Sequence, residues 1–269
     1  MAMPRSLILR APGTNCDVET AHAFARAGAA PTTLHLNRAL DNPRVLDEFQ
    51  ILCIPGGFSY GDDVAAGRIF GNQIQHHLAD QLREFRERGK LVLGICNGFQ
   101  VLMRAGILFS ESAASASAAP QAQPAPPATL AWNDSGKFEA RWVRLKVTSA
   151  TCVFFRGIDT MYLPVAHAEG KLVVRDAATL SGLEARGQIV LRYARLDAAQ
   201  DTAEQYPDNP NGSTAAIAGM CDATGRVCGF MPHPERHIDR TQHPRWTRGE
   251  GADEGDGLRV FRNAVEYFA

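Results

Sequence analysis

The chain has 269 residues, 45% of them hydrophobic, which is enough for one large α/β domain or two smaller ones. Its 28 basic and 29 acidic residues give a net charge of −1, and this balance argues against a nucleic-acid-binding protein, which normally carries a basic excess. The sequence has no apolar run long enough to span a membrane, and its first residues, Met-Ala-Met-Pro-Arg, lack the apolar stretch of a signal peptide. We therefore expect a soluble, cytoplasmic protein with neither a membrane nor a nucleic-acid partner.

Short apolar strands alternate with helices over the first hundred residues. This order predicts an α/β fold with a doubly wound, mostly parallel sheet that is flanked by helices. We expect one helix over Val18–Ala27, capped by Asn15 or Asp17, and a second helix over residues 71–87. The strands of this part are expected at residues 6–9, 32–36, 49–54 and 91–95.

The middle of the chain departs from this alternation. Residues 111–131 are rich in Ala, Ser, Pro and Gln, a composition typical of a flexible surface insertion. Residues 246–256 are acidic and glycine-rich, which is typical of a solvated loop. We expect a single domain over residues 1–269, with further strands at 138–147, 171–174, 188–193 and 226–231 and a closing helix over 257–268.

The spacing of the cysteines excludes the common structural zinc motifs. No two of them lie closer than seven positions, so the chain has no C-x-x-C pair. A large apolar chain that is not secreted has no need of disulfides either. We expect no metal site and no disulfide among the six cysteines, which are Cys16, Cys53, Cys96, Cys152, Cys221 and Cys228.

Residues 90–100, Lys-Leu-Val-Leu-Gly-Ile-Cys-Asn-Gly-Phe-Gln, combine a buried strand, a cysteine and the start of a helix. Gly94 and Gly98 flank Cys96 in the pattern G-x-C-x-G, which is the thiol form of a nucleophile elbow. Such a turn holds its central residue at a helix N-terminus, where the helix dipole favours a thiolate. Free cysteines are more often inert packing residues. A nucleophilic role for Cys96 therefore needs the support of a base and an oxyanion site elsewhere in the chain.

Two further loops follow apolar strands, and they supply candidates for the oxyanion site and for the base. Residues 55–62, Pro-Gly-Gly-Phe-Ser-Tyr-Gly-Asp, offer backbone N–H groups suited to an oxyanion or a substrate carboxylate, although an ordinary tight turn has the same composition. The other loop holds His233 and Glu235, two positions apart on an expected extended segment, which puts both side chains on one face. Glu235 would then fix the tautomer of His233, and His233 would act as the base for Cys96.

Six segments together resemble the class I (triad-type) glutamine amidotransferases, and within them the glutaminase subunits of phosphoribosylformylglycinamidine synthase. The segments span most of the chain in the order of the family, and the resemblance implies a flavodoxin-like α/β fold. The sequence departs from the family pattern at Ala11, where a bulkier apolar residue is expected, and at Ala168, where glycine is more frequent. The matching segments are residues 12–17, 56–63, 94–100, 166–170, 209–213 and 231–236.

The resemblance also implies roles for individual residues. Cys96 corresponds to the family's nucleophile, His233 to its general base and acid, and Glu235 to the residue that orients the histidine. The expected oxyanion hole consists of the backbone N–H groups of Gly57 and Asn97, and the expected contacts with the substrate L-glutamine are Gln100, Phe58 and His167.

The implied reaction is hydrolysis of glutamine through a γ-glutamyl thioester. The ammonia would pass to a synthetase subunit, with or without a small accessory subunit, which uses ATP and magnesium to aminate formylglycinamide ribonucleotide in de novo purine biosynthesis. The chain itself is expected to need no cofactor. Two alternatives stay open, namely a glutaminase that serves another synthetase and a non-catalytic assembly subunit that keeps the fold.

Overall fold

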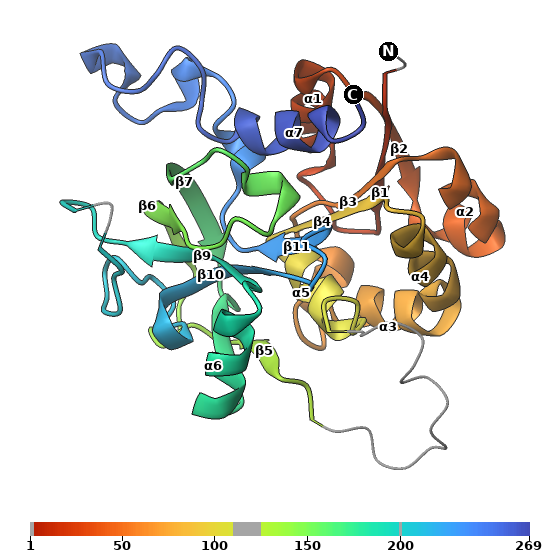
Figure 1. The fold of residues 1–269 in the computed structure, drawn as a ribbon, viewed down its shortest axis with the longest axis horizontal. Coiled ribbons are helices and arrows are strands. Elements are labelled where there is room, and N and C mark those ends of the chain that lie inside the picture. The colour runs from red at the N-terminus through yellow and green to blue at the C-terminus, as the bar shows by residue number, and fades with distance from the viewer. Residues whose placement is uncertain (1–2, 110–124, 199–200) are drawn as a thin grey trace.

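The computed structural model describes residues 3–109, 125–198 and 201–269. Within these residues, nine strands form one sheet in the order β2-β1-β3-β4-β11-β10-β9-β6-β7, and β5 pairs with β8 separately (Figure 1). The strands are β1 Arg5–Arg10, β2 Ala30–His35, β3 Ile51–Ile54, β4 Leu91–Ile95, β5 Ala128–Ala131, β6 Glu139–Val147, β7 Thr160–His167, β8 Lys171–Val174, β9 Ile189–Ala194, β10 Ile217–Cys221 and β11 Val227–Phe230.

One half of the sheet is parallel. β1 pairs in parallel with β2 and β3, and β4 pairs in parallel with β3 and β11. β3, β4 and β11 are buried along their whole length, which explains why they are continuous apolar runs in the sequence. The strand order 2-1-3-4 is that of flavodoxin-like sheets, which bind ligands beyond the carboxyl ends of their strands. The predicted α/β fold class is thus confirmed, although the parallel strands make up one half of a mixed sheet rather than most of it.

Helices cover both faces of the parallel strands (Figure 1). α1 and α7 lie together on one face, where Phe24 packs edge to face against Phe261 with ring centroids 4.9 Å apart. Burial of such a ring contributes roughly 1.5–3 kcal/mol, which fixes the last helix to the first. The helices are α1 Asp17–Ala27, α2 Leu36–Asp41, α3 Arg68–His77, α4 Ala79–Glu87, α5 Asn97–Arg104, α6 Ala177–Ala185 and α7 Leu258–Glu266.

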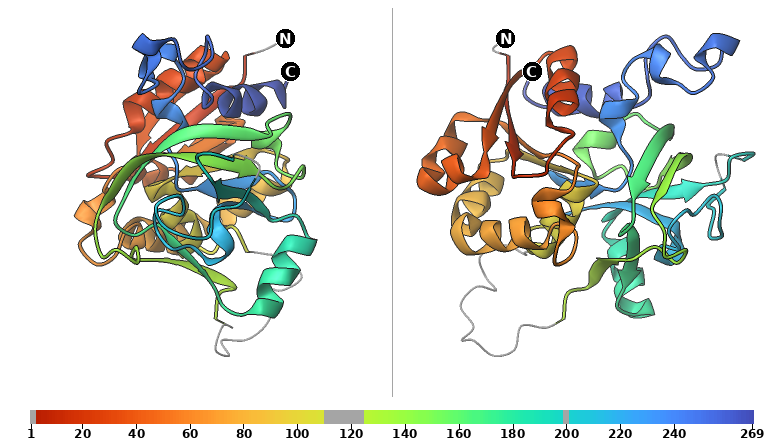
Figure 2. Two further views of the ribbon diagram at one scale, coloured as in Figure 1. Left: turned by 90° about the vertical axis from the view of Figure 1, so that its left-hand side faces the viewer. Right: turned by 180° about the vertical axis from the view of Figure 1, so that it is seen from behind.

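The other half of the sheet is antiparallel, with β11, β10, β9, β6 and β7 pairing in turn. It lies at the end of the molecule away from α2 (Figure 2). The sequence patterns predict β6, β9 and β11 but miss β7 and β10. Pro164 hides β7 because proline is rare inside strands, whereas the structure puts this strand at the edge of the sheet, where proline is tolerated.

Two helix predictions need correction. The cap of the first helix is Cys16, not Asn15 or Asp17, and its side chain makes no capping hydrogen bond. The helix predicted over residues 71–87 is two helices, α3 and α4, which meet at Leu78. Leu78 has φ −126° and ψ 4°, outside the helical region, and its side chain is fully buried, so the break packs an apolar residue into the core.

The predicted insertion at residues 111–131 ends earlier than the composition indicates. Its positions up to 124 lie outside the described residues. Residues 128–131, however, form strand β5, which pairs with β8 and buries Ala128 and Leu130. The pattern Ala-Thr-Leu-Ala is too short and too small in side-chain volume to be distinguished by composition from the Ala- and Pro-rich residues before it.

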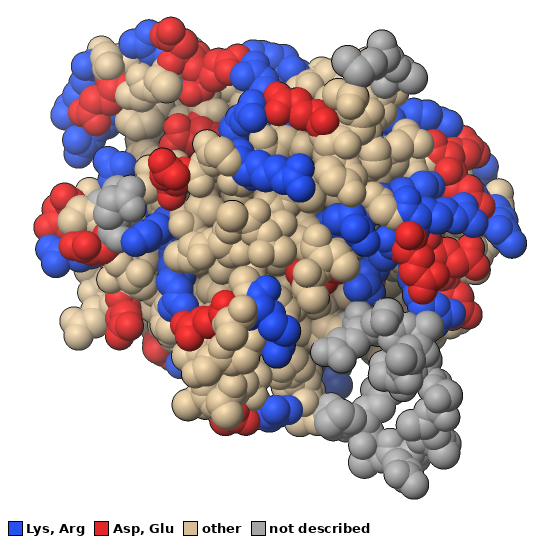
Figure 3. All heavy atoms as spheres, viewed as in Figure 1, with Lys and Arg blue, Asp and Glu red and all other residues tan. Residues whose placement is uncertain are grey.

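Charged side chains of both signs are interspersed on the face in Figure 3, as the net charge of −1 leads us to expect. Large fields of one sign, which would attract a nucleic acid, do not occur on this face. In the part of the chain that the structure describes, none of the helices has the length and apolar character needed to cross a membrane.

Candidate active site

The carboxyl ends of β1, β3, β4 and β11 bring four loops together. Cys16, in the loop after β1, donates its backbone N–H to Gly56 O at 3.3 Å. Gly56 lies so close to His233 that a Cβ at this position would be 2.8 Å from Cε1 of the ring. Cys96 N–H donates to Phe230 O at 2.8 Å, which joins the end of β4 to the end of β11. The predicted Cys, His and glycine loops therefore converge at one edge of the sheet.

Cys96 occupies the strained turn that the G-x-C-x-G pattern predicts. Its φ is 50° and its ψ is −105°, a conformation that L residues rarely adopt. A Cβ on Gly98 would lie 1.8 Å from Ile54 O, and one on Gly94 would lie 2.6 Å from Gly98 O. The two glycines thus let strand and helix backbones touch, and they hold the Cys96 thiol at the N-terminus of α5, where the helix dipole favours negative charge.

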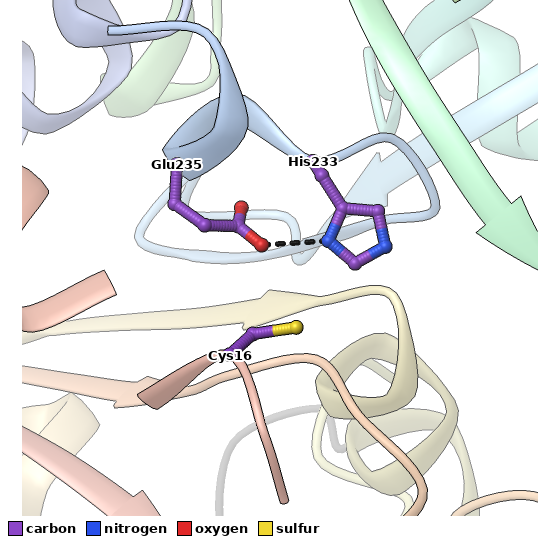
Figure 4. Close-up of side chains that lie close together, drawn as sticks. All are labelled: Cys16, His233 and Glu235. Atoms are coloured by element: carbon purple, nitrogen blue, oxygen red, sulfur yellow. Dashed lines mark hydrogen bonds and ion pairs between the residues drawn. The ribbon is translucent and has the colours of Figure 1, made fainter. Parts of the chain in front are cut away.

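His233 and Glu235 form a buried pair, with Nδ1 of the ring 2.6 Å from Oε1 of the carboxylate (Figure 4). The contact is the predicted one, but the predicted extended segment is wrong. Residues Pro234–Arg236 form a single 3₁₀ turn, which the fixed φ of Pro234 favours. The turn, rather than strand alternation, brings the carboxylate back to the ring. Nδ1–H donates to Glu235, so Nε2 is the nitrogen left for chemistry.

The charge environment of His233 favours the protonated ring. Burial disfavours imidazolium, but the negative charges of Glu235 and of a Cys96 thiolate outweigh it and hold the pKa of His233 well above its usual range. Nε2 is buried and forms no hydrogen bond with any residue in the described ranges. A histidine in this state can stabilise a neighbouring thiolate and afterwards give a proton to a leaving group.

Both predicted oxyanion donors lie in this region. Gly57 has φ +133°, and a Cβ there would lie 2.6 Å from Asn15 N, so only glycine fits. Asn97 is the first residue of α5, where a backbone N–H has no acceptor within the helix. The side chain of Asn97 accepts from Ser59 N–H at 3.3 Å. This bond links residues 55–62, the glycine loop, to the turn that holds Cys96.

Comparison with known proteins agrees with this geometry. A family model described as a CobB/CobQ-like glutamine amidotransferase domain matches residues 3–268. Phosphoribosylformylglycinamidine synthase subunit PurQ of Dehalococcoides mccartyi is 44% identical over 273 residues, which cover 99% of this chain and 98% of the relative. The chain belongs to the PurQ family of glutamine amidotransferases.

Two further relatives support the assignment to the PurQ family. PurQ of Archaeoglobus fulgidus is 40% identical over 273 residues, covering 97% of this chain and 95% of the relative. In the structure of PurLQS from Thermotoga maritima, the matching chain is 30% identical, has a TM-score of 0.71, and is covered completely, as is this chain. The similarity thus extends over the antiparallel half of the sheet as well as the parallel half.

The predicted substrate contacts of this PurQ-family chain have different environments. Gln100 is buried, and its amide is occupied, since Oε1 accepts from Asn97 Nδ2 at 2.9 Å and Nε2 donates to Glu169 O at 2.6 Å. Phe58 is exposed and stacks on Phe138, with ring centroids 6.2 Å apart. Gln100 therefore connects the loops around the site, and Phe58 lies at the surface.

His167 is buried and neutral. Burial, with a smaller effect from the positive charge of His233, lowers the pKa of His167 to about 3. Its Nδ1 lies 3.2 Å from Asn133 Oδ1, which also accepts from Gly170 N–H at 3.0 Å. Nδ1 is therefore the protonated nitrogen, and Nε2 is a buried acceptor without a partner among the described residues.

Sequence reasoning missed three residues of the site. Cys16 faces the His233–Glu235 pair (Figure 4). Arg236 Nη2 lies 3.1 Å from the Cys16 sulfur. Atoms of Cys16, His233 and Glu235 lie within 4.8 Å of one another and are of the types that bind zinc. The Arg236 guanidinium, however, puts a positive charge against the sulfur, which opposes a cation there. Cys16 and Arg236 both occur in segments that resemble the family, but their chemistry depends on contacts between distant loops.

Asp62, the third missed residue, makes the stability of the site depend on pH. Burial and the charge of Glu169 raise the pKa of Asp62 to about 6 from an ordinary value of 3.8, against opposing hydrogen bonds from Gly67 N–H and Asn97. A carboxyl with a raised pKa destabilises the folded state when it is charged. We therefore expect protonation of Asp62 to increase the free energy of unfolding as the pH falls from about 7 to 4.

Asp62→Asn removes this charge at every pH. We expect the variant to be more stable than the parent chain at pH 7.5, with a difference that shrinks by pH 4.5. Urea unfolding at both pH values measures it, and Asp41→Asn, which removes an exposed carboxylate at the end of α2, is the control. An equal difference at both pH values would contradict the raised pKa.

Proposed function

We propose that this chain is the glutaminase subunit of phosphoribosylformylglycinamidine synthase and that Cys96, His233 and Glu235 carry its reaction. One observation carries the assignment of roles. The strained Cys96 elbow and the buried His233–Glu235 pair, far apart in the sequence, meet at the carboxyl edge of the sheet. The identity of 44% to a PurQ subunit over almost the whole chain supports glutamine as the substrate.

In the first step, Cys96 thiolate attacks the carboxamide carbon of glutamine. The N–H groups of Gly57 and Asn97 stabilise the negative oxygen that develops. His233 Nε2–H gives its proton to the leaving nitrogen, so the carbon–nitrogen bond breaks and yields ammonia and a γ-glutamyl thioester. His233 then takes a proton from water, which attacks the thioester and releases glutamate. The sum is glutamine plus water to glutamate plus ammonia.

The groups named above are sufficient for this chemistry, so we propose that the subunit needs no cofactor. ATP and magnesium belong to the synthetase, which has to activate formylglycinamide ribonucleotide before ammonia can add to it. All six cysteines are free thiols, and the proposed nucleophile must stay reduced to react. We therefore propose a cytoplasmic location, because that compartment keeps thiols reduced.

Partner binding is proposed to open the site. Only 4% of Cys96 and 2% of His233 are exposed, so a substrate of the size of glutamine reaches them only after a loop moves. The glycine loop is a candidate, because Tyr60 and Asp62 both have a φ of 56° and can relax when it moves. The related PurLQS assembly suggests a synthetase and a small third subunit as the partners.

Glutamate release tests this proposal when measured with the chain alone and with a PurL-type synthetase, a PurS-type subunit, ATP, magnesium and formylglycinamide ribonucleotide. We expect slow release by the chain alone, faster release in the full mixture, and one amidine formed per glutamate. Release that responds instead to an unrelated ATP-dependent synthetase would support the first alternative function. No release under any condition would support a non-catalytic subunit.

A further inference from the structure

The outer edge of β7 carries the loop that holds the His233–Glu235 pair. In the part of the chain that the structure describes, β7 is an edge strand and pairs with β6 alone. On its other side, Pro164 O accepts from His233 N–H at 2.8 Å, and Tyr162 O lies 2.8 Å from Nδ1 of His237. Because carbonyls two positions apart face the same side of a strand, the segment from His233 to His237 lies along this edge.

The two contacts anchor both ends of the turn that contains Glu235. The 3₁₀ turn runs over Pro234–Arg236, with His233 before it and His237 after it. His237 N–H donates to Pro234 O at 3.1 Å and closes the turn. Glu235 therefore lies between two anchors on β7, one through the backbone of His233 and one through the ring of His237.

The ring of His237 is the donor in its contact with β7. A carbonyl oxygen can only accept, so Nδ1 carries the proton. Burial lowers the pKa of His237, an effect that the Tyr162 carbonyl and the charge of Asp256 oppose, and the charge of His243 lowers it further. The ring is 2% exposed and packs edge to face on Trp142, with ring centroids 5.0 Å apart. The hydrogen bond to Tyr162 O is therefore shielded from water, which strengthens it.

The turn depends on this anchor because the chain leaves the domain directly after it. Residues 239–256 project from the domain, and most of their side chains are exposed (Figure 1). Exposed segments with few packed neighbours open at a low cost in free energy. The chain returns at Gly257, whose N–H donates to His237 O at 2.8 Å. His237 thus joins the turn, the edge of β7 and both ends of the projecting segment.

We propose that His237 is a positioning residue for the proposed glutaminase reaction, and that its Nδ1–H, bound to Tyr162 O, keeps the turn closed so that Glu235 stays against His233. The inference rests on the proposed function. It follows from the geometry of the pair, because the turn brings Glu235 Oε1 within 2.6 Å of His233 Nδ1. If the turn opens, the carboxylate moves away, and the His233 ring loses both its orientation and the charge that favours its protonated form.

His237→Leu and His237→Asn separate the donor from the packing of the ring. Both side chains branch at Cγ and are similar in size, but asparagine can place an amide N–H where Nδ1–H lies, whereas leucine has only methyl groups there. We expect His237→Leu to lower kcat for glutamine about 10–100-fold, the range typical of groups that orient a reactive side chain, with KM near that of the parent. His237→Asn should regain most of the lost kcat. The measurement uses the complex with the synthetase.

The pH profile of kcat shows whether the loss acts through Glu235. Without the carboxylate, burial of the ring lowers the pKa of His233, so the alkaline limb should move to lower pH in His237→Leu. His237→Asn should keep the limb of the parent. Three other titratable groups that interact electrostatically with His233 are the same in every variant, namely Cys96, Cys16 and His167.

His243→Leu is the matched control. It removes a second buried histidine, whose ring centroid lies 5.7 Å from that of His237 but whose Nδ1 accepts from Arg245 N–H in the projecting segment. This variant should be less stable than the parent and should keep its kcat and its alkaline limb.

Four results would overturn the inference. They are a parental kcat and alkaline limb in His237→Leu, no recovery in His237→Asn, the same loss in His243→Leu, and a parallel loss of ammonia-dependent synthesis in His237→Leu, which would place the defect in folding or assembly. Failure of the proposed function would look different, because glutamine hydrolysis would then continue without Cys96.

Discussion

Cys96→Ala is expected to abolish glutamine-dependent amidine synthesis and to leave ammonia-dependent synthesis by the complex intact. Without the sulfur no thioester forms, and the remaining oxyanion donors cannot replace a nucleophile, so we expect a loss of at least about 10⁴-fold in kcat. Added ammonia supports synthesis because it replaces the ammonia that the glutaminase site releases for the synthetase. Parallel assays with glutamine and with ammonium chloride on the same complex measure both quantities.

Cys53→Ala is a suitable control for Cys96→Ala, because it removes a fully buried thiol from the neighbouring strand β3. It should keep both activities at comparable levels. If Cys96→Ala retained substantial glutamine-dependent activity, the nucleophile would lie elsewhere. If it lost the ammonia-dependent activity as well, the variant would be affecting assembly rather than the proposed chemistry.

Glu235→Gln is expected to lower kcat with glutamine by about 10²–10⁴-fold. The side chain keeps its size but loses the charge that raises the pKa of His233, so burial of the ring then dominates and lowers that pKa. The amide can also donate to Nδ1, which puts the ring proton on Nε2 and prevents it from accepting one. The alkaline limb of the pH profile should therefore move to lower pH.

A pH profile of kcat for Glu235→Gln measures this shift, with ammonia-dependent synthesis as a check on assembly. Glu84→Gln, at an exposed carboxylate on α4, provides the matched control and should behave like the parent. A kcat for Glu235→Gln within about threefold of the parent would show that His233 needs no carboxylate partner.

The local parts of the site can be predicted from the sequence because local sterics determine them. The Cys96 elbow needs glycines where strand and helix touch, and the sequence has them on both sides of the cysteine, at Gly94 and Gly98. The His233–Glu235 contact is also correct, although a 3₁₀ turn around Pro234 makes it rather than an extended segment.

The parts that depend on distant contacts cannot be predicted in this way. Cys16 has no local signal beyond its place before a helix, and the nearby Asn15 and Asp17 are better caps by residue type. It reaches the site because the loops that follow β1 and β11 meet there, where Arg236 Nη2 donates to the Cys16 sulfur. The pKa of Asp62 likewise depends on Glu169, which follows β7, and Pro164 conceals that strand in the sequence.

The most direct test of the central claim is to react the complex with a chloroketone analogue of glutamine and to locate the adduct among the six cysteines by peptide mass spectrometry. We expect a single adduct on Cys96, which glutamine suppresses and which forms much more slowly in Glu235→Gln. Adducts spread over the six cysteines, or formed first on the neighbouring Cys16, would contradict the claim that Cys96 is the activated nucleophile.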